Sequence, residues 1–274
     1  MQATADRLRR DKKTIGLVPT MGFLHAGHIR LIEEARQTCD TLVVSIFVNP
    51  VQFGPHEDFD KYPRDLEHDK SLLINSGTDI LFCPAVEEMY PGEQKTYVFT
   101  EDLAQKLCGV SRPTHFRGVT TVVAKLFNII KPHVAVFGQK DAQQALILKK
   151  MVTDLNFDLN MIVVPTVREP DGLALSSRNQ YLSPEERKAA PEIYRALMQA
   201  RNMIANGMRA RKNIEAYIRD ILNTVPHLRI EYIAVVDTGS LEPVEQISGG
   251  AMIATAVYCG TTRLIDNIII DETG

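Results

Sequence analysis

Short apolar runs alternate with segments of helical periodicity through the first 166 residues, and this alternation is what most restricts the fold. Alternating strands and helices indicate a parallel sheet with crossover helices. The runs are apolar at nearly every position, which is typical of strands covered on both faces. We therefore expect an α/β fold with a doubly wound, Rossmann-like parallel sheet, which binds ligands at the carboxyl ends of its strands. The expected strands are IGLVPT, LVVSIFV, DILFCP, HVAVFG and NMIVVPTV.

The segments between these runs predict helices. Thr100 is followed by two acidic residues, which is typical of an N-cap, and Gly109 is typical of a helix end. Pro132 stops the helix that precedes it. The expected helices cover residues 29–40, 66–76, 100–109, 119–130 and 141–155.

The sequence changes character after Thr166. The polar stretch REPDGLALSSRNQYLSPEE predicts a long loop and a domain boundary. Helices are expected at residues 184–206 and 211–224, followed by the strands RIEYIAVVD, AMIATAVYC and RLIDNIII. We thus expect a Rossmann-like domain at 1–166 and a second, smaller α+β domain at 167–274.

The charge balance and the cysteines exclude several classes of protein. Thirty-one Lys and Arg against 34 Asp and Glu give a net charge of −3, which disfavours a nucleic-acid partner. The four cysteines include no C-x-x-C pair, so we expect buried, reduced thiols rather than a zinc or disulfide framework. No apolar run is long enough to span a bilayer, and the start lacks the apolar region of a signal peptide. These features predict a cytoplasmic protein without a membrane partner.

The most informative segment is PTMGFLHAGHIRL, which joins the first strand to the first helix. His25 and His28 are three residues apart at a helix N-terminus, where free N–H groups favour a phosphate. Gly22 and Gly27 would let that phosphate approach the backbone. The alternative is a tight turn with two surface histidines. A metal site is disfavoured because no acidic residue separates the histidines as in an H-E-x-x-H helix. Candidate third ligands are His56, His68, His115 and His133.

Two further segments carry groups suited to phosphate. In FGQKDAQQ, Lys140 provides a point charge and Asp141 could hold a ribose hydroxyl, unless the two form a solvated pair. In LSSRN, hydroxyls and Arg178 suit a polyphosphate, but the same letters describe an ordinary polar loop.

Two other segments suit a carboxylate or hydroxyl substrate. In SRPTHFRGV, Arg112, His115 and Arg117 precede an apolar helix, where Arg117 is equally suited to a surface ion pair. In NPVQFG, Asn49 and Gln52 offer neutral hydrogen bonds, unless the Asn-Pro pair only forms a turn. Motifs at the carboxyl ends of strands in one sheet are expected to converge on one crevice.

Seven motifs together resemble the pantoate–β-alanine ligase family of the nucleotidylyl-transferase superfamily. They are PTMGFLHAGH, FVNPVQFG, YPRDLEHD, RPTHFRGV, FGQKD-x-QQ, PTVREPDGLALSSRN and TRLIDN, and they span residues 15–270 in order. The resemblance implies ATP-dependent condensation of pantoate with β-alanine through a pantoyl-adenylate, with release of AMP and pyrophosphate. It also implies Mg²⁺, a homodimer, and a lid formed by the C-terminal domain.

The resemblance also implies the site residues. His28, with His25, would stabilise charge at the α-phosphate, while Lys140 and Arg178 would hold the pyrophosphate. Gln52 and Gln144 would bind pantoate, and Asn49 and Arg112 are further candidates for the substrate. Asp69 is the candidate for the neighbourhood of Mg²⁺. The ATP site would comprise Met21, Gly22, Phe23, Leu24, His25, Ala26, Gly27, His28, Gly138, Gln139, Lys140, Asp141, Val167, Leu175, Ser176, Ser177 and Arg178.

The chain departs from the family pattern at Ala26, Thr114 and Gln139, and none of the three departures removes a named ligand. The resemblance further implies that the chain begins inside the family's first helix, without the short strand that usually precedes it. Two other functions would share part of this pattern. An aminoacyl-tRNA synthetase-like enzyme would share the histidine turn but should carry a basic surface. A non-enzymatic nucleotide-binding regulator should lose Lys140 or a histidine, and all are present.

Overall fold

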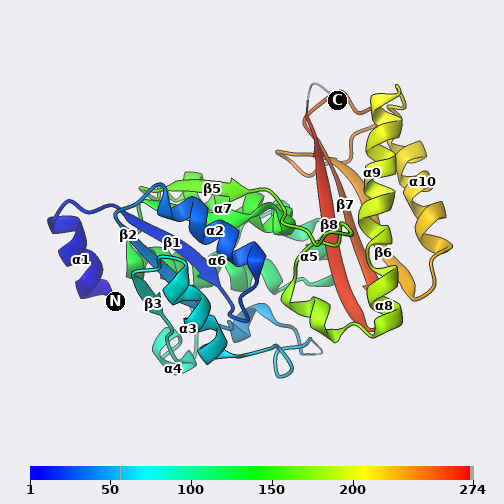
Figure 1. Ribbon diagram of the computed structural model, residues 1–274. Helices are drawn as coiled ribbons and strands as arrows, with labels where there is room; N and C mark the ends of the chain where they lie inside the picture. Colours follow the sequence, from blue (N-terminus) through cyan, green and yellow to red (C-terminus); the bar gives the residue numbers. More distant parts are fainter. Residues whose placement is uncertain (56, 272–274) are drawn as a thin grey trace. The chain divides into compact units, whose positions relative to one another are not determined.

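Five parallel strands form the sheet of the first unit, in the order β3-β2-β1-β4-β5 (Figure 1). The computed structural model describes residues 1–55 and 57–271, and the chain divides into units of residues 1–166 and 167–274. The sheet grows outward from β1 in both directions, so the expected doubly wound class is confirmed. The strands are β1 (Ile15–Thr20), β2 (Thr41–Ile46), β3 (Ile80–Phe82), β4 (Val134–Gly138) and β5 (Asn160–Val164).

Helices cover both faces of this sheet. Successive side chains of the central strands point to opposite faces, so they enter different cores. Leu17 of β1 packs in the core formed with α6 and α7, whereas Val18 packs in the core formed with α2 and α3. Val163 on the edge strand β5 is exposed, so the expected burial on both faces is wrong there. The helices of this unit are α1 (Gln2–Arg10), α2 (Ala26–Arg36), α3 (Leu66–Asn75), α4 (Val86–Met89), α5 (Cys108–Ser111), α6 (His115–Ile130) and α7 (Ala142–Asp154), with 3₁₀ turns η1 (Pro50–Gln52), η2 (Leu103–Gln105) and η3 (Gln139–Asp141).

The helix expected at residues 100–109 is wrong. The segment forms the short elements η2 and α5, with Leu107 between them in a left-handed conformation at φ 45°. The buried amide of Gln143 on α7 donates to the carbonyls of Leu103 (2.9 Å) and Lys106 (2.7 Å) and accepts from Cys108 N–H (3.0 Å). A long-range side chain therefore replaces the backbone hydrogen bonds that a continuous helix would make.

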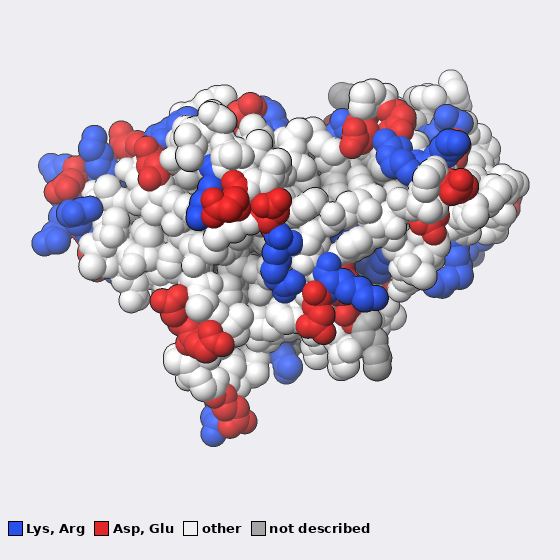
Figure 2. Space-filling model, turned by 60° about the horizontal axis from the view of Figure 1, so that its bottom comes forward, with Lys and Arg blue, Asp and Glu red and all other residues white. Residues whose placement is uncertain are grey.

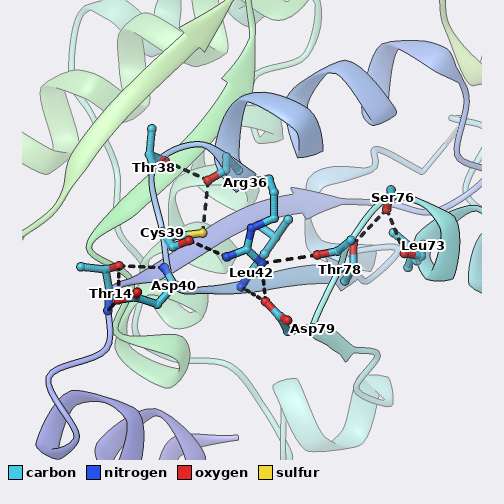
Figure 3. Close-up of polar contacts among 12 residues, drawn as sticks. Thr14, Arg36, Thr38, Cys39, Asp40, Leu42, Leu73, Ser76, Thr78 and Asp79 are labelled. Carbon is cyan, nitrogen blue, oxygen red and sulfur yellow. Dashed lines mark hydrogen bonds and ion pairs between the residues drawn. The ribbon is translucent and has the colours of Figure 1, made fainter.

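Polar side chains join neighbouring strands at the amino ends of the sheet (Figure 3). Asp40, just before β2, accepts hydrogen bonds from the backbone N–H and the hydroxyl of Thr14, both at 2.8 Å. Arg36 at the end of α2 pairs with Asp79 at 2.5 Å, and Asp79 also accepts the N–H of Leu42 at 2.7 Å. These contacts fix where the strands begin.

The second unit contains an antiparallel sheet in the order β6-β7-β8, lying beside α9 and α10 (Figure 1). Its strands are β6 (Leu228–Asp237), β7 (Ala251–Cys259) and β8 (Thr262–Ile270). The helix expected at residues 184–206 is interrupted near Pro191, which has no N–H to continue it. The helices are α8 (Pro184–Ala189), α9 (Glu192–Ala205) and α10 (Arg211–Asn223), preceded by the 3₁₀ turn η4 (Ser177–Tyr181).

None of the four cysteines, all of which the structure describes, is in a disulfide, but the expectation that all are buried is wrong. Cys108 and Cys259 are buried, Cys39 is half-buried and Cys83 is exposed. Figure 2 shows Lys and Arg side chains scattered among Asp and Glu side chains on the face in view, in line with the small net charge. Within residues 1–55 and 57–271, no helix combines the length and hydropathy needed to cross a membrane.

Candidate active site

Three of the predicted segments follow neighbouring strands of the parallel sheet. Residues 21–28 follow β1, residues 49–52 follow β2, and residues 139–141 follow β4. The amide of Gln52 donates to Met21 Sδ at 3.1 Å, which joins the first two segments. The charge of Lys140 acts on His25 and His28, which joins the third. The expected convergence at the carboxyl edge of the sheet is therefore present in the first unit.

The two histidines cap the helix that they begin. His25 is the N-cap of α2, and its Nδ1 accepts the backbone N–H of Gly27 at 3.1 Å. In return, Nδ1 of His28 accepts the backbone N–H of His25 at 3.3 Å. The ring centroids are 4.1 Å apart. Since each Nδ1 is an acceptor, this hydrogen-bond network assigns the proton of each neutral ring to Nε2.

Both rings are neutral near pH 7. Burial lowers the pKa of His28 well below its ordinary value, helped by the charge of Lys140 and by the repulsion that a proton on His25 would exert. Burial, with the charge of Lys140, lowers the pKa of His25 to about 4. The turn therefore presents two neutral Nε2–H donors beside a lysine charge.

The backbone that carries these histidines is unusual. Gly22 and Phe23 both have positive φ angles, of 80° and 50°. The hydroxyl of Thr20 accepts Gly22 N–H at 3.2 Å and donates to the carbonyl of Ser45 at 2.9 Å. The turn is thus tied to the end of β2 as well as to its own strand.

Asp69, the expected neighbour of Mg²⁺, contacts the backbone of the histidine turn. Its side chain is on α3 and only 1% of the residue is exposed. Oδ2 accepts the N–H of Phe23 at 2.9 Å, and Oδ1 accepts the N–H of Leu24 at 2.6 Å. Asp69 therefore holds the histidine turn. Among the described residues no group of three or more His, Cys, Asp or Glu could hold a metal ion, and His56 lies outside those residues.

Asn49, a candidate for the substrate, contacts Gln52 and other protein groups. Its amide nitrogen donates to Gln52 Oε1 at 3.0 Å and to the Gly118 carbonyl at 3.2 Å. Its Oδ1 accepts the hydroxyl of Tyr90 at 2.8 Å. All of these partners are protein groups, and only 1% of Asn49 is exposed. The Gln52 side chain is therefore oriented by a buried relay from Tyr90 through Asn49.

Arg112, another candidate for the substrate, also contacts this segment. Its Nε and Nη2 atoms bind the two carboxylate oxygens of Glu57 at 2.6 Å and 2.5 Å. Burial would raise the pKa of Glu57, but the hydrogen bond and charge of Arg112 lower it. Nδ1 of His115 lies 2.9 Å from the Gln52 carbonyl, and Arg112 Nη2 lies 3.5 Å from the same oxygen. The backbone of Gln52 is thus held as firmly as its side chain.

The segment after β4 places Lys140 and Asp141 on η3, with the lysine nitrogen 3.6 Å from the carboxylate. Gly138 ends β4 and Gln139 begins the turn. Gln144 lies in the first turn of α7, next to the buried Gln143. Sequence reasoning missed Gln143, Tyr90 and Glu57, since each acts through a partner distant in sequence.

The remaining predicted residues belong to the second unit. Leu175 N–H donates to the Val167 carbonyl at 3.0 Å, and Ser176 Oγ accepts Arg178 N–H at 3.3 Å as the N-cap of η4. Ser177 is buried. The loop is anchored by Arg168, which binds both carboxylate oxygens of Asp266 at 2.6 Å and 2.8 Å. The segment has a defined conformation within its own unit.

A family model described as pantoate-beta-alanine ligase matches residues 1–269. The chain belongs to this family. Pantothenate synthetase from Moorella thermoacetica is 54% identical over 258 residues, covering 94% of this chain and 91% of the relative. The pantothenate synthetase from Pelotomaculum thermopropionicum is 53% identical over 272 residues, covering 99% of this chain and 96% of the relative.

Two crystal structures agree with this membership. Pantothenate synthetase from Thermus thermophilus has a TM-score of 0.92 at 47% identity, with 96% of each chain covered. Pantoate-beta-alanine ligase from Francisella tularensis, complexed with beta-gamma ATP and beta-alanine, has a TM-score of 0.81 at 35% identity, covering 99% of this chain and 96% of that chain. The expected activity is confirmed: the chain is an ATP-dependent ligase that condenses pantoate with β-alanine.

Proposed function

We propose that the turn after β1 is the adenylation site, where His25 and His28 act as neutral hydrogen-bond donors to the α-phosphate of ATP. The observation that carries this proposal is the pair of Nδ1 atoms that accept backbone N–H groups, which leaves each Nε2–H to face a ligand. Charge develops on the phosphate oxygens as the pantoate carboxylate attacks the phosphorus. Donors fixed in advance stabilise that charge without reorganisation.

Lys140 supplies the positive charge of this site. Its ammonium interacts with both histidines, and it suits the departing pyrophosphate as a point charge. The roles of Ser176, Ser177 and Arg178 in holding the same pyrophosphate, and of Val167 and Leu175 in holding ATP, stay predictions. So does the role of residues 167–274 as a lid.

Pantoate is assigned to Gln52 and Gln144. The relay from Tyr90 through Asn49 fixes the Gln52 amide, which suits it to position a hydroxyl or carboxylate. The carboxylate oxygen forms a bond to the α-phosphorus as pyrophosphate leaves. The amine of β-alanine then attacks the acyl carbon of the pantoyl-adenylate, and AMP leaves as the amide forms. Water must be excluded until the amine arrives, because it would hydrolyse the mixed anhydride.

Magnesium is assigned to ATP rather than to a protein cage. Both oxygens of Asp69 accept backbone N–H groups, and the described residues contain no cluster of three ligands. Mg²⁺ characteristically keeps several waters and binds through substrate phosphates. A homodimer and a cytoplasmic location stay predictions.

Pyrophosphate release from Mg·ATP and pantoate, with and without β-alanine, tests this assignment. AMP and pantothenate are followed in the same reactions. We expect His28→Ala to lower kcat/KM by on the order of 10²- to 10³-fold, as for other lost oxyanion donors. The matched control is His68→Ala, an exposed histidine on α3, which should keep activity. Near-normal turnover by His28→Ala would contradict the proposed role of the turn.

A further inference from the structure

The carboxylate of Asp69 is buried against the backbone of the histidine turn. It lies on α3, 46 and 45 residues further along the chain than its two partners. Each oxygen accepts one backbone N–H, from Phe23 and from Leu24. Hydrogen bonds to an ionised acceptor are about twice as strong as neutral ones. Asp69 therefore clamps two consecutive peptide groups.

The clamped peptides are those that need support. Phe23 has a φ of 50°, a left-handed conformation that costs a non-glycine residue free energy and persists only where its surroundings fix it. Gly22 precedes it at φ 80°, and a Cβ on Gly22 would lie 3.0 Å from Asp69 Oδ2. The carboxylate thus fills the concave side of the turn, where two successive N–H groups converge.

The clamp leads directly to the histidines. Leu24, the second clamped residue, is bonded to His25, whose N–H donates to His28 Nδ1. A shift of the Phe23–Leu24 peptide would therefore move the N-cap residue and break the contact that orients the His28 ring. Misplacement of about 1 Å at a reacting group can lower a rate by on the order of 10²-fold.

We propose that Asp69 is a positioning residue for adenylation: it holds the Phe23–Leu24 backbone so that the histidine Nε2–H groups point at the phosphate. This inference rests on the function proposed above for the turn. It assigns Asp69 to the backbone of the chain and not to a metal ion.

The test replaces Asp69 by asparagine, which keeps the size of the side chain but turns one acceptor into an NH₂ group facing a backbone N–H. We expect kcat to fall by on the order of 10- to 100-fold, since pyrophosphate release becomes slow. The KM for β-alanine and the Mg²⁺ concentration for half-maximal activity should stay within about twofold. The matched control is Asp65→Asn, which makes the same change at the N-cap of the same helix, bonded to His68 N–H, and leaves the turn intact.

Three outcomes would overturn the inference. A kcat for Asp69→Asn within about twofold of the parent would show that the clamp is dispensable. Recovery of kcat at high Mg²⁺ would make Asp69 a metal contact. An equal fall of kcat in Asp65→Asn would mean that α3 matters only as a folded helix. His28→Ala, measured alongside, separates the two proposals: if it too stays active, the role of the turn has failed, and not only that of Asp69.

A second variant covers the case in which Asp69→Asn does not fold. Phe23→Gly in the same chain relieves the left-handed strain, since glycine adopts positive φ freely. A folded double variant with low kcat supports the positioning role. Normal kcat in that variant overturns it.

Discussion

The two ends of one parallel sheet are built from different chemistry. At the amino ends, Asp40 and Asp79 accept hydrogen bonds close to the surface, and Arg36 and Asp79 have side chains 32% and 46% exposed. At the carboxyl ends, Asp69 is buried, Phe23 is left-handed, and the rings of two adjacent histidines are kept neutral. Stabilising contacts gather at one edge, and strained, desolvated groups gather at the other, where we propose that adenylation takes place.

This difference shows how one scaffold separates stability from activity. The strands are shared, so substitutions at either end act on the same β1 and β2. Exposed ion pairs contribute little to the free energy of unfolding, whereas buried, oriented groups change a reaction rate steeply. Substitutions at the amino edge should therefore change stability slightly and activity hardly at all.

The largest expected effect is at Lys140. Lys140→Ala should lower kcat/KM by on the order of 10²- to 10³-fold, because the charge that we propose stabilises the leaving pyrophosphate is lost. Steady-state pyrophosphate release measures it. The control is Lys150→Ala, an exposed lysine on α7 paired with Asp154, which should retain activity. Equal activity of the two variants would contradict the proposed difference between the two ends of the sheet.

Acid should destabilise the fold through the neutral histidines. The pKa values of His25 and His115 are lowered to about 4 in the folded chain, so the unfolded chain binds protons first as the pH falls below 6.5. Their contribution is present above pH 6.5 and is lost progressively towards pH 4. The free energy of unfolding should fall by about 2 kcal/mol for each histidine between pH 7.5 and 5.

Denaturant unfolding at several pH values measures this loss. His115→Gln, which keeps a side chain able to hydrogen-bond the Gln52 carbonyl, should lose less stability on acidification than the parent chain. An identical pH dependence in the two proteins would contradict the assignment to His115.

The next effect in size is expected at Gly118, near the carboxyl edge of the sheet, where a larger side chain should not be tolerated. A Cβ there would lie 2.5 Å from the Val51 carbonyl and 2.6 Å from Gln52 Cα. Gly118→Ala should therefore lower the free energy of unfolding by about 1–3 kcal/mol and raise the KM for pantoate. Gly54→Ala is the control, because its nearest neighbour would be Glu57 at 3.7 Å. Thermal unfolding and pantoate titration of both variants decide the point.

Removing one hydroxyl of the buried relay should have a smaller effect. Burial, with a contribution from Tyr97, raises the pKa of Tyr90 to about 12, so its hydroxyl remains a donor to Asn49. Tyr90→Phe should raise the KM for pantoate several-fold, as expected for a loss of about 1 kcal/mol. Tyr97→Phe, an exposed tyrosine, should leave that KM unchanged. A rise in the KM for ATP alone would be inconsistent with the relay.

The smallest effect is expected at the amino edge. Asp79→Asn removes the partner of Arg36 and should lower the free energy of unfolding by about 0.5–1 kcal/mol. Its kcat should equal that of the parent chain. A clear loss of kcat would mean that the two edges are coupled through β2, and the comparison would need revision.

The sequence predicted the parts of the fold that depend on local periodicity. The runs IGLVPT and AMIATAVYC coincide with β1 and β7, and the division after Thr166 lies where the polar stretch begins. The expected helix at 100–109 was wrong because its N-cap signal is local, whereas the Gln143 amide that replaces its hydrogen bonds lies on α7.

The same limit applies to the site. The histidines and Lys140 were found because they follow strands directly, and strand ends meet at one edge. The hydrogen bonds of Asn49 to Tyr90 and of Arg112 to Glu57 were not predicted, because these partners are 41 and 55 residues away in sequence. Residue type and spacing do not reveal that a polar group is already occupied by a distant side chain.

The contact of Asp69 with the turn also decides whether the histidine motif could function in another protein. Residues 19–31 contain both histidines and both glycines, so the sequence alone suggests an independent structural unit. Yet the peptides of Phe23 and Leu24 are held by a carboxylate from α3. The Thr20 hydroxyl likewise donates to a carbonyl at the end of β2. Grafting the thirteen-letter motif PTMGFLHAGHIRL onto another parallel sheet would transfer the imidazoles without the contacts that aim them. The transplantable unit is therefore the turn together with β2 and α3.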